Sequence, residues 1–144
     1  MSKAARLEPL ADYAGKVETQ AARRLAASAQ TLAAKEQEVE QLRGYLAEYR
    51  QRAALSDATD PLRWQNARAF LAKLSEVVAA RERELAQAVE NYRAETERWR
   101  DSHRRVKSLD KIVAAAEREE GMALAKREQN ELDEHALRRV LERG

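Results

Sequence analysis

The chain has 144 residues, of which 36% are charged and only 5% aromatic, and its formal net charge is +2. This composition is typical of coiled coils and long helices, and it offers little material for a catalytic pocket. The chain contains no cysteine, which excludes disulfides and thiolate metal sites. Its 27 basic and 25 acidic residues are finely interspersed, which argues against a dedicated nucleic-acid binder.

The amino terminus passes directly into a charged amphipathic pattern and has no apolar stretch of the kind found in signal peptides. No window of the chain approaches the roughly 18 apolar residues that a membrane-spanning helix needs. We therefore expect a cytoplasmic protein without direct membrane insertion.

The first helix is predicted from about residue 7 to residue 55. Pro9 fits its first turn, where the missing N–H breaks no hydrogen bond. Val17, Ala21 and Leu25 follow one another in two steps of four, a stutter that locally unwinds a supercoil. Lys35 occupies a position of the apolar row and should weaken the middle of this helix.

A hairpin loop is predicted at about 56–60, where the chain reads Ser-Asp-Ala-Thr-Asp before Pro61. Asp60 as the N-cap and Pro61 as the first helical residue form a strong start signal for a helix. A connection this short between two long amphipathic helices makes them antiparallel.

The second helix is predicted over about 61–125 or beyond, and it carries the clearest pattern of the chain. Counting by sevens gives an unbroken apolar row: Trp64, Leu71, Val78, Leu85, Tyr92, Trp99, Val106 and Val113. The companion row three residues later is mixed, with Arg81, Glu95 and Ser102 among its members. A sustained repeat of seven keeps its apolar stripe covered only when two helices supercoil.

The sequence therefore predicts an all-α fold, a two-helix antiparallel coiled-coil hairpin whose second helix is longer than the first. Residues 1–144 form a single coiled-coil domain in this prediction, and the free chain is a monomer. The second helix should extend beyond its partner near residues 105–115. The segment at about 126–144 should be a weakly anchored tail.

Residues that could support catalysis or ligand binding are few. His103 and His135 are far apart and lack neighbouring acids at ligand spacing, so both are expected to be solvated, and we expect no enzyme activity, cofactor or metal. A basic run at 98–111, in which Asp101 and Asp110 are the only acidic residues, contains Arg98, Arg100, Arg104, Arg105, Lys107 and Lys111. Helical spacing spreads these cations around the helix, which favours an ordinary solvated face over a binding stripe.

One feature exceeds what a coiled coil requires. Tyr45, Phe70 and Val77 fall beside the apolar rows, at positions where coiled coils usually place Glu or Lys. With their neighbours they form what we call the apolar patch: Leu42, Tyr45, Tyr49, Phe70, Leu74 and Val77. Such a patch either thickens the core near the loop or forms a surface for a protein partner.

At these residues the sequence resembles the FliJ family, the small coiled-coil component of the flagellar type III export apparatus. The resemblance is carried by Leu42, Tyr45, Glu48, Tyr49 and Arg50 before the loop, and by Arg63, Trp64, Phe70, Leu71, Leu74, Trp99 and Arg100 after it. It extends to the segment from Arg127 to Arg139, in which Leu132-Asp133-Glu134-His135-Ala136 matches a similar pattern of the family. Each motif is weak alone, but their order and spacing are more specific.

The resemblance implies a non-enzymatic stalk, similar to the gamma subunit of rotary ATP synthases, that sits in the central hole of the hexameric flagellar export ATPase. It also implies contact with the cytoplasmic domain of the membrane export gate and escort of export chaperones. The protein would then be associated peripherally with the flagellar basal body at the inner membrane. Residues around 10–30 and the end of the second helix after about 110 would contact the ATPase ring.

The gate-contacting surface of the family carries over to Leu42, Tyr45, Tyr49, Phe70 and Leu74, which match in type. It also carries over to Glu38, Val77 and Arg81, where the residue types depart from the family's usual forms.

Three alternatives remain open from the sequence. An injectisome stalk protein would share the architecture and the role, although the neighbourhoods of Tyr49 and Trp64 favour the flagellar system. A generic scaffold would pair extended helices between two chains, but Asp60-Pro61 would break a continuous helix. A nucleic-acid binder would reveal itself by salt-dependent binding.

Overall fold

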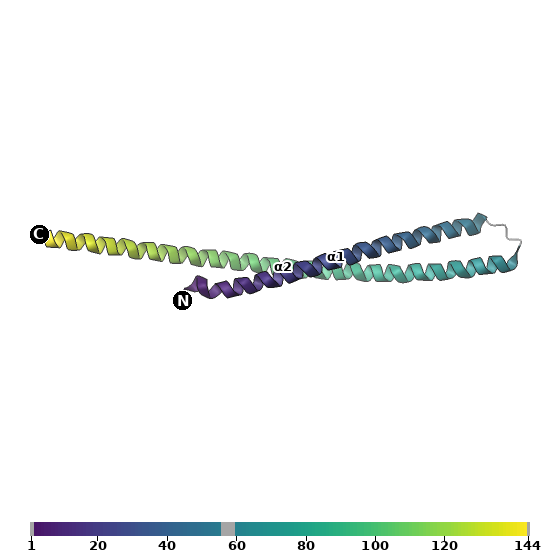
Figure 1. The fold of residues 1–144 in the computed structure, drawn as a ribbon, viewed down its shortest axis with the longest axis horizontal. Coiled ribbons are helices and arrows are strands. Elements are labelled where there is room, and N and C mark those ends of the chain that lie inside the picture. The colour runs from purple at the N-terminus through teal and green to yellow at the C-terminus, as the bar shows by residue number, and fades with distance from the viewer. Residues whose placement is uncertain (1, 56–59, 144) are drawn as a thin grey trace. The chain divides into compact units, whose positions relative to one another are not determined.

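The computed structural model describes residues 2–55 and 60–143, and these residues form two helices (Figure 1). Helix α1 spans Lys3–Leu55 and helix α2 spans Pro61–Arg143. The prediction of an all-α hairpin with a longer second helix is confirmed, since α1 has 53 residues and α2 has 83. Of the predicted loop, residues 56–59 lie outside the described residues.

The start of α2 is formed by Asp60, as the sequence predicts. The side-chain Oδ1 of Asp60 accepts a hydrogen bond from the N–H of Leu62 at 3.0 Å, and its carbonyl accepts one from the N–H of Trp64 at 3.1 Å. Pro61 follows as the first helical residue, where no N–H is required. The cap satisfies a backbone donor that the first turn of a helix otherwise leaves open.

The chain divides into two compact units, which we describe separately. The unit Ala21–Trp99 contains the second part of α1 and the first part of α2. In it Lys35 pairs with Glu84, whereas Tyr49, further along α1, contacts Phe70, further back along α2. This opposite progression shows that the two helical segments run antiparallel.

The other unit contains the segments Met1–Gln20 and Arg100–Gly144. The N–H of Ala4 donates a hydrogen bond to Glu120 Oε1 at 3.0 Å, and Ala116 is only 2% exposed. Contact between the helices therefore continues to residue 120, beyond the predicted end at 105–115. The difference arises because α1 begins at Lys3, about one turn earlier than predicted.

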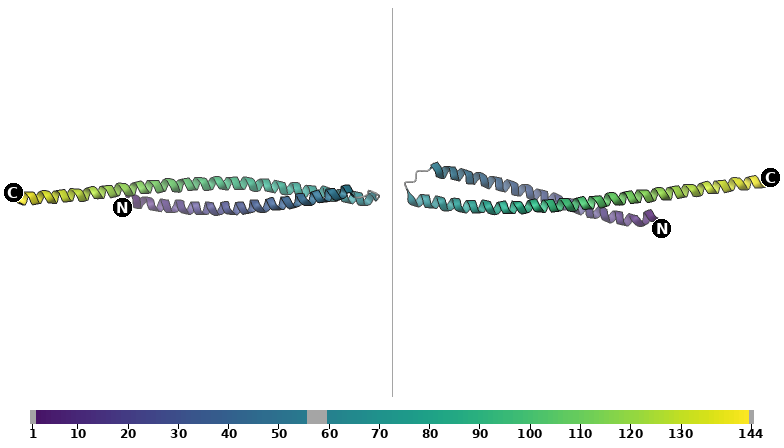
Figure 2. Two further views of the ribbon diagram at one scale, coloured as in Figure 1. Left: turned by 90° about the horizontal axis from the view of Figure 1, so that it is seen from above. Right: turned by 180° about the vertical axis from the view of Figure 1, so that it is seen from behind.

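Beyond this contact, α2 continues alone. Every residue from 121 to 143 is helical and exposed, and we call this segment the overhang. Figure 2 shows in both views that the end of α2 extends past the beginning of α1. Among the described residues, no helix is long and apolar enough to cross a membrane.

The core is one layer of side chains between the helices. Of the predicted apolar row of α2, Val78 is buried, while five members are half-buried: Leu71, Leu85, Trp99, Val106 and Val113. The large rings of Trp64 and Tyr92 remain 47% and 36% exposed. The companion row contains the small residues Ala88, Ser102 and Ala116, which are all buried. A small side chain is covered completely by the facing helix, whereas a large ring extends past the edge of so narrow a core.

Candidate protein-contact site

The apolar patch lies on α1 and α2 within the unit Ala21–Trp99. Leu42 and Leu74 are half-buried and form its base. Its remaining members are largely exposed: Tyr45 at 53%, Phe70 at 48%, Val77 at 43% and Tyr49 at 39%. These four side chains therefore present apolar surface to solvent instead of thickening the core.

Two of the aromatic rings hold each other in place. The rings of Tyr49 and Phe70 meet edge to face across the two helices, with centroids 5.0 Å apart and an angle of 69° between their planes. The guanidinium of Arg52 lies 5.6 Å from the centroid of the Tyr49 ring, and it also donates to Glu48 Oε1 at 2.8 Å. These contacts order the rings before any partner binds.

A shallow hollow of about 210 Å³ adjoins this aromatic pair. It is lined by Tyr49, Arg52, Ala53, Ala67, Phe70 and Leu71. Exposed, ordered aromatic side chains beside a hollow are the features by which protein surfaces anchor a partner, because little conformational entropy is lost on binding.

A closed ring of four charged side chains, which we call the charge ring, crosses the helix pair in the same unit. Lys35 Nζ lies 3.0 Å from Glu84 Oε2 and 3.8 Å from Glu38 Oε2. Arg81 Nε lies 2.9 Å from Glu38 Oε1, and its Nη1 lies 2.9 Å from Glu84 Oε1. Each cation thus contacts both carboxylates, and two of the four pairs join different helices.

The charge ring changes the interpretation of Lys35. From the sequence this residue should weaken the core, but the structure pairs it with two carboxylates. The hydrogen bond from Lys35 holds the pKa of Glu84 below its ordinary value; partial burial opposes this shift, and the charges of Arg81 and Lys35 add to it. Lys35 and Arg81 stand out in the sequence as cations within the apolar rows, but the sequence alone does not show which carboxylates of the other helix lie opposite them.

Glu38 and Arg81, two of the predicted gate-contacting residues, therefore belong to the charge ring, whereas Val77 belongs to the apolar patch. The structure brings Tyr49 and Phe70 into direct contact, and it leaves Tyr45 as the most exposed of the aromatic side chains in the patch.

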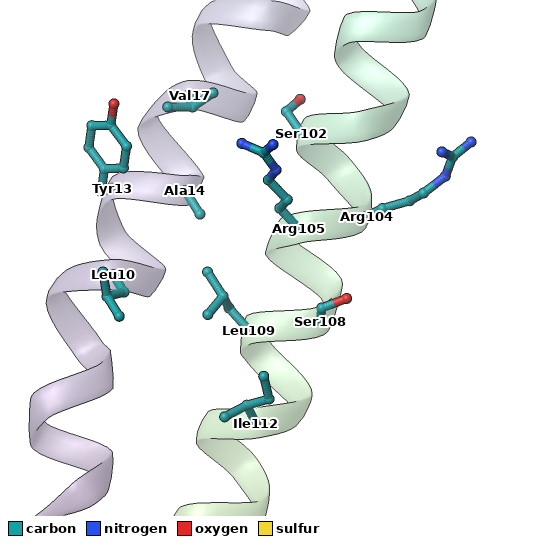
Figure 3. A pocket seen from close by; sticks show the side chains of 10 residues that line it. All are labelled: Leu10, Tyr13, Ala14, Val17, Ser102, Arg104, Arg105, Ser108, Leu109 and Ile112. Atoms are coloured by element: carbon teal, nitrogen blue, oxygen red, sulfur yellow. The ribbon is translucent and has the colours of Figure 1, made fainter.

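The basic run lies in α2, and several of its cations are paired along the helix. Arg98 pairs with Glu95 at 2.8 Å and Arg104 pairs with Asp101 at 3.1 Å. Arg104 and Arg105 also line a groove in the unit that holds both termini, together with Leu10, Tyr13, Ala14, Val17, Ser102, Ser108, Leu109 and Ile112 (Figure 3).

The two histidines differ in their surroundings. His135 is exposed in the overhang, as expected from the sequence. His103 was expected to be solvated, but it is half-buried, with Nδ1 3.5 Å from Glu18 Oε2 on the facing helix. The sequence could not reveal this pairing because it depends on how α1 lies along α2. In residues 2–55 and 60–143, no cluster of three or more His, Cys, Asp or Glu side chains could hold a metal ion.

These features define a class, the two-helix antiparallel coiled-coil hairpins, here with exposed aromatic side chains beside the core. The sequence profile of one family, described as "Flagellar FliJ protein", matches residues 2–144. The chain belongs to the FliJ family and is a component of the flagellar protein export apparatus. This family is non-enzymatic and acts in association with other export components. No curated protein and no solved structure was found to match the chain.

Proposed function

We propose that this protein is the stalk of the hexameric flagellar export ATPase. The observation that carries the proposal is the greater length of α2, which leaves 121–143 as an exposed helix beyond the beginning of α1. An isolated helix in water is only marginally stable unless a partner covers it. The ring of the ATPase would supply that partner, and residues around 10–30 would contact it as well.

The apolar patch serves a second partner in this proposal, the cytoplasmic domain of the membrane export gate. Tyr45, Tyr49 and Phe70 would be the anchors, with Leu42 and Leu74 beneath them. Their exposure and the mutual contact of Tyr49 and Phe70 support this assignment. Glu38 and Arg81 would act indirectly, because both are bound in the charge ring and hold the helices beneath the patch.

Export chaperones are further partners in this proposal, and the protein would act in the cytoplasm, at the flagellar basal body. Pairing of α1 with α2 inside one chain supports a monomeric hairpin over a scaffold that pairs extended helices between chains.

The experiment that tests the stalk proposal is a titration of the cognate flagellar export ATPase with the purified chain. We expect ATP hydrolysis to rise as the chain is added, and we expect ring assembly, followed by light scattering, to rise in parallel. Circular dichroism establishes that the added chain is helical. A folded chain that neither binds the ATPase nor stimulates it would refute the proposal.

A further inference from the structure

The groove between α1 and α2 in the unit that holds both termini is largely apolar. Its volume is about 440 Å³, which lies within the range of sites that bind ligands or clusters of side chains. Figure 3 shows Leu109 and Ile112 directed from α2 toward α1, and Leu10 on the opposite wall. Leu10 is 54% exposed and Ile112 is 45% exposed. The helix pair therefore leaves large aliphatic side chains only partly covered here.

Small residues explain why the groove stays open. Ala14 lies on the α1 wall, and Ser102 lies on the α2 wall. These side chains are too short to fill the space between the helices. The stutter from Val17 to Leu25 begins in the same stretch of α1, and such an insertion locally unwinds a coiled coil.

The charged side chains that line the groove are positive. Of the described residues that line it, Arg104 and Arg105 are charged, and none is a carboxylate. Arg104 points away from α1 and pairs with Asp101, whereas Arg105 reaches toward α1 and forms no ion pair with any described residue (Figure 3). A cation beside uncovered aliphatic groups matches a partner that carries both apolar groups and negative charge.

The α1 wall has the same character. Arg6 precedes Leu10 by four residues, so the two lie on one face of the helix. Glu8 and Asp12 each lie two residues from Leu10, and at that spacing they point away from it. Helical spacing thus places one further cation, Arg6, on the face of α1 that carries Leu10.

We propose that this groove binds a helical segment of a partner protein, whose aliphatic side chains at helical spacing enter between Leu10 and Ile112 and whose carboxylates pair with Arg105 and Arg6. The inference rests on the proposed function, since it specifies the chemistry by which this end of the hairpin recognises its partner. Helices that dock into apolar grooves commonly use anchors spaced three and four residues apart.

The test uses the isotope-labelled full-length chain and two synthetic helical peptides, followed by amide chemical shifts in NMR. Both peptides carry Leu at helical spacing, and they differ only in having Glu or Lys beside the leucines. We expect the Glu peptide to shift the amides of Leu10, Val17, Leu109 and Ile112, and we expect binding to weaken as salt is added. The Lys peptide should bind at least tenfold more weakly.

Variants of the chain locate the contact. Arg105→Glu should weaken binding of the Glu peptide by about tenfold, because attraction becomes repulsion. Lys107→Glu makes the same change of charge two residues away, on a face that does not line the groove, and it should leave the affinity unchanged. Equal effects of the two variants, equal affinity for the two peptides, or shifts confined to other residues would overturn the proposal.

The peptide experiment involves no ATPase, so its result is separate from the stalk proposal. Stimulation of the ATPase without peptide binding in the groove would refute this inference alone. Peptide binding in the groove without stimulation would refute the stalk proposal alone.

Discussion

Tyr45 and Phe70 belong to the same patch, but their rings are held differently. Phe70 packs edge to face against Tyr49, whereas Tyr45 is 53% exposed. Truncation of Phe70 therefore removes a contact between the helices as well as exposed surface. Truncation of Tyr45 removes mainly exposed surface, so it isolates the contribution of the patch to binding.

We predict that Tyr45→Ala weakens binding to the cytoplasmic domain of the export gate by at least about tenfold, the effect typical of an exposed aromatic anchor. Helicity should stay unchanged in circular dichroism, because the side chain is mostly in solvent. Tyr13→Ala is the matched control, since Tyr13 is 68% exposed but lies outside the patch. Equal affinity of wild type and Tyr45→Ala in calorimetry would contradict the assignment.

The stability that the charge ring contributes should depend on pH through the carboxyl group of Glu84. Its pKa in the folded chain lies below the ordinary value because Lys35 donates a hydrogen bond to it and Arg81 and Lys35 add positive charge nearby. A carboxylate with a lowered pKa contributes stability above its unfolded-state pKa, and this contribution is lost as the pH falls through the folded-state pKa. The contribution is therefore present at neutral pH, begins to fall as the pH drops below the ordinary glutamate pKa of 4.5, and is lost once the pH is below the folded-state pKa.

We predict that Glu84→Gln lowers the melting temperature at neutral pH and reduces its fall on acidification. Thermal unfolding measured by circular dichroism across the acid range checks both effects. Glu76→Gln is the control, because Glu76 is exposed on the same helix and forms no ion pair with any described residue. The same loss of stability in both variants would show that the ring has no special role.

At the scale of the helices, much could be predicted from the sequence. The repeat from Trp64 to Val113 predicts one long helix, and Asp60 with Pro61 predicts where it begins. Both predictions depend on local signals, namely spacing along one chain and the chemistry of a cap. The end of contact between the helices was predicted less well, because it depends on where α1 begins. The sequence prediction placed Pro9 in the first turn, but α1 begins at Lys3 and Pro9 lies inside it. The start signal is Ser2, whose Oγ accepts a hydrogen bond from the N–H of Ala5 at 3.1 Å.

The Asp60 cap leads to a prediction for α2. Asp60→Ala should destabilise the first turn by about 1 kcal/mol, because the N–H of Leu62 loses its acceptor. Faster hydrogen exchange at Leu62 and its neighbours would show this. Asp60→Asn should preserve slow exchange, because asparagine also accepts a hydrogen bond at this position. Unchanged exchange in Asp60→Ala would mean that the cap does not stabilise the turn.

Contacts between facing helices were harder to predict than the helices themselves. The pairings of Lys35 with Glu84 and of Glu18 with His103 require knowledge of which residues lie opposite each other. The same limit applies to the groove at Leu10 and Ile112, because its opening depends on which small side chains face each other. The apolar patch was easier to find, since unusual residue types at Tyr45, Phe70 and Val77 are visible in the sequence alone.

At the scale of the whole molecule, removal of the overhang should impair stimulation of the ATPase without lowering the stability of the hairpin. In a chain that ends after Gly121, all of the described residues that are lost, 122–143, are exposed, so its melting temperature should stay within about 2 °C of the full-length value. Its stimulation of the export ATPase should fall strongly, since the proposed ring contact is removed. Binding to the gate domain should persist and serves as the internal control. Full stimulation by the shortened chain would exclude the overhang from the ring contact.

The charge ring has one more consequence, which concerns the alignment of the hairpin. Apolar rows that repeat every seven residues also match after one helix slips along the other by one heptad. Such a slip would place Lys35 opposite Val77 or Asn91 and Arg81 opposite Thr31 or Tyr45, so that both cations would lose the carboxylates they meet across the helices. We therefore expect the charge ring to favour one alignment of the two helices within the unit Ala21–Trp99 over the alignments shifted by a heptad.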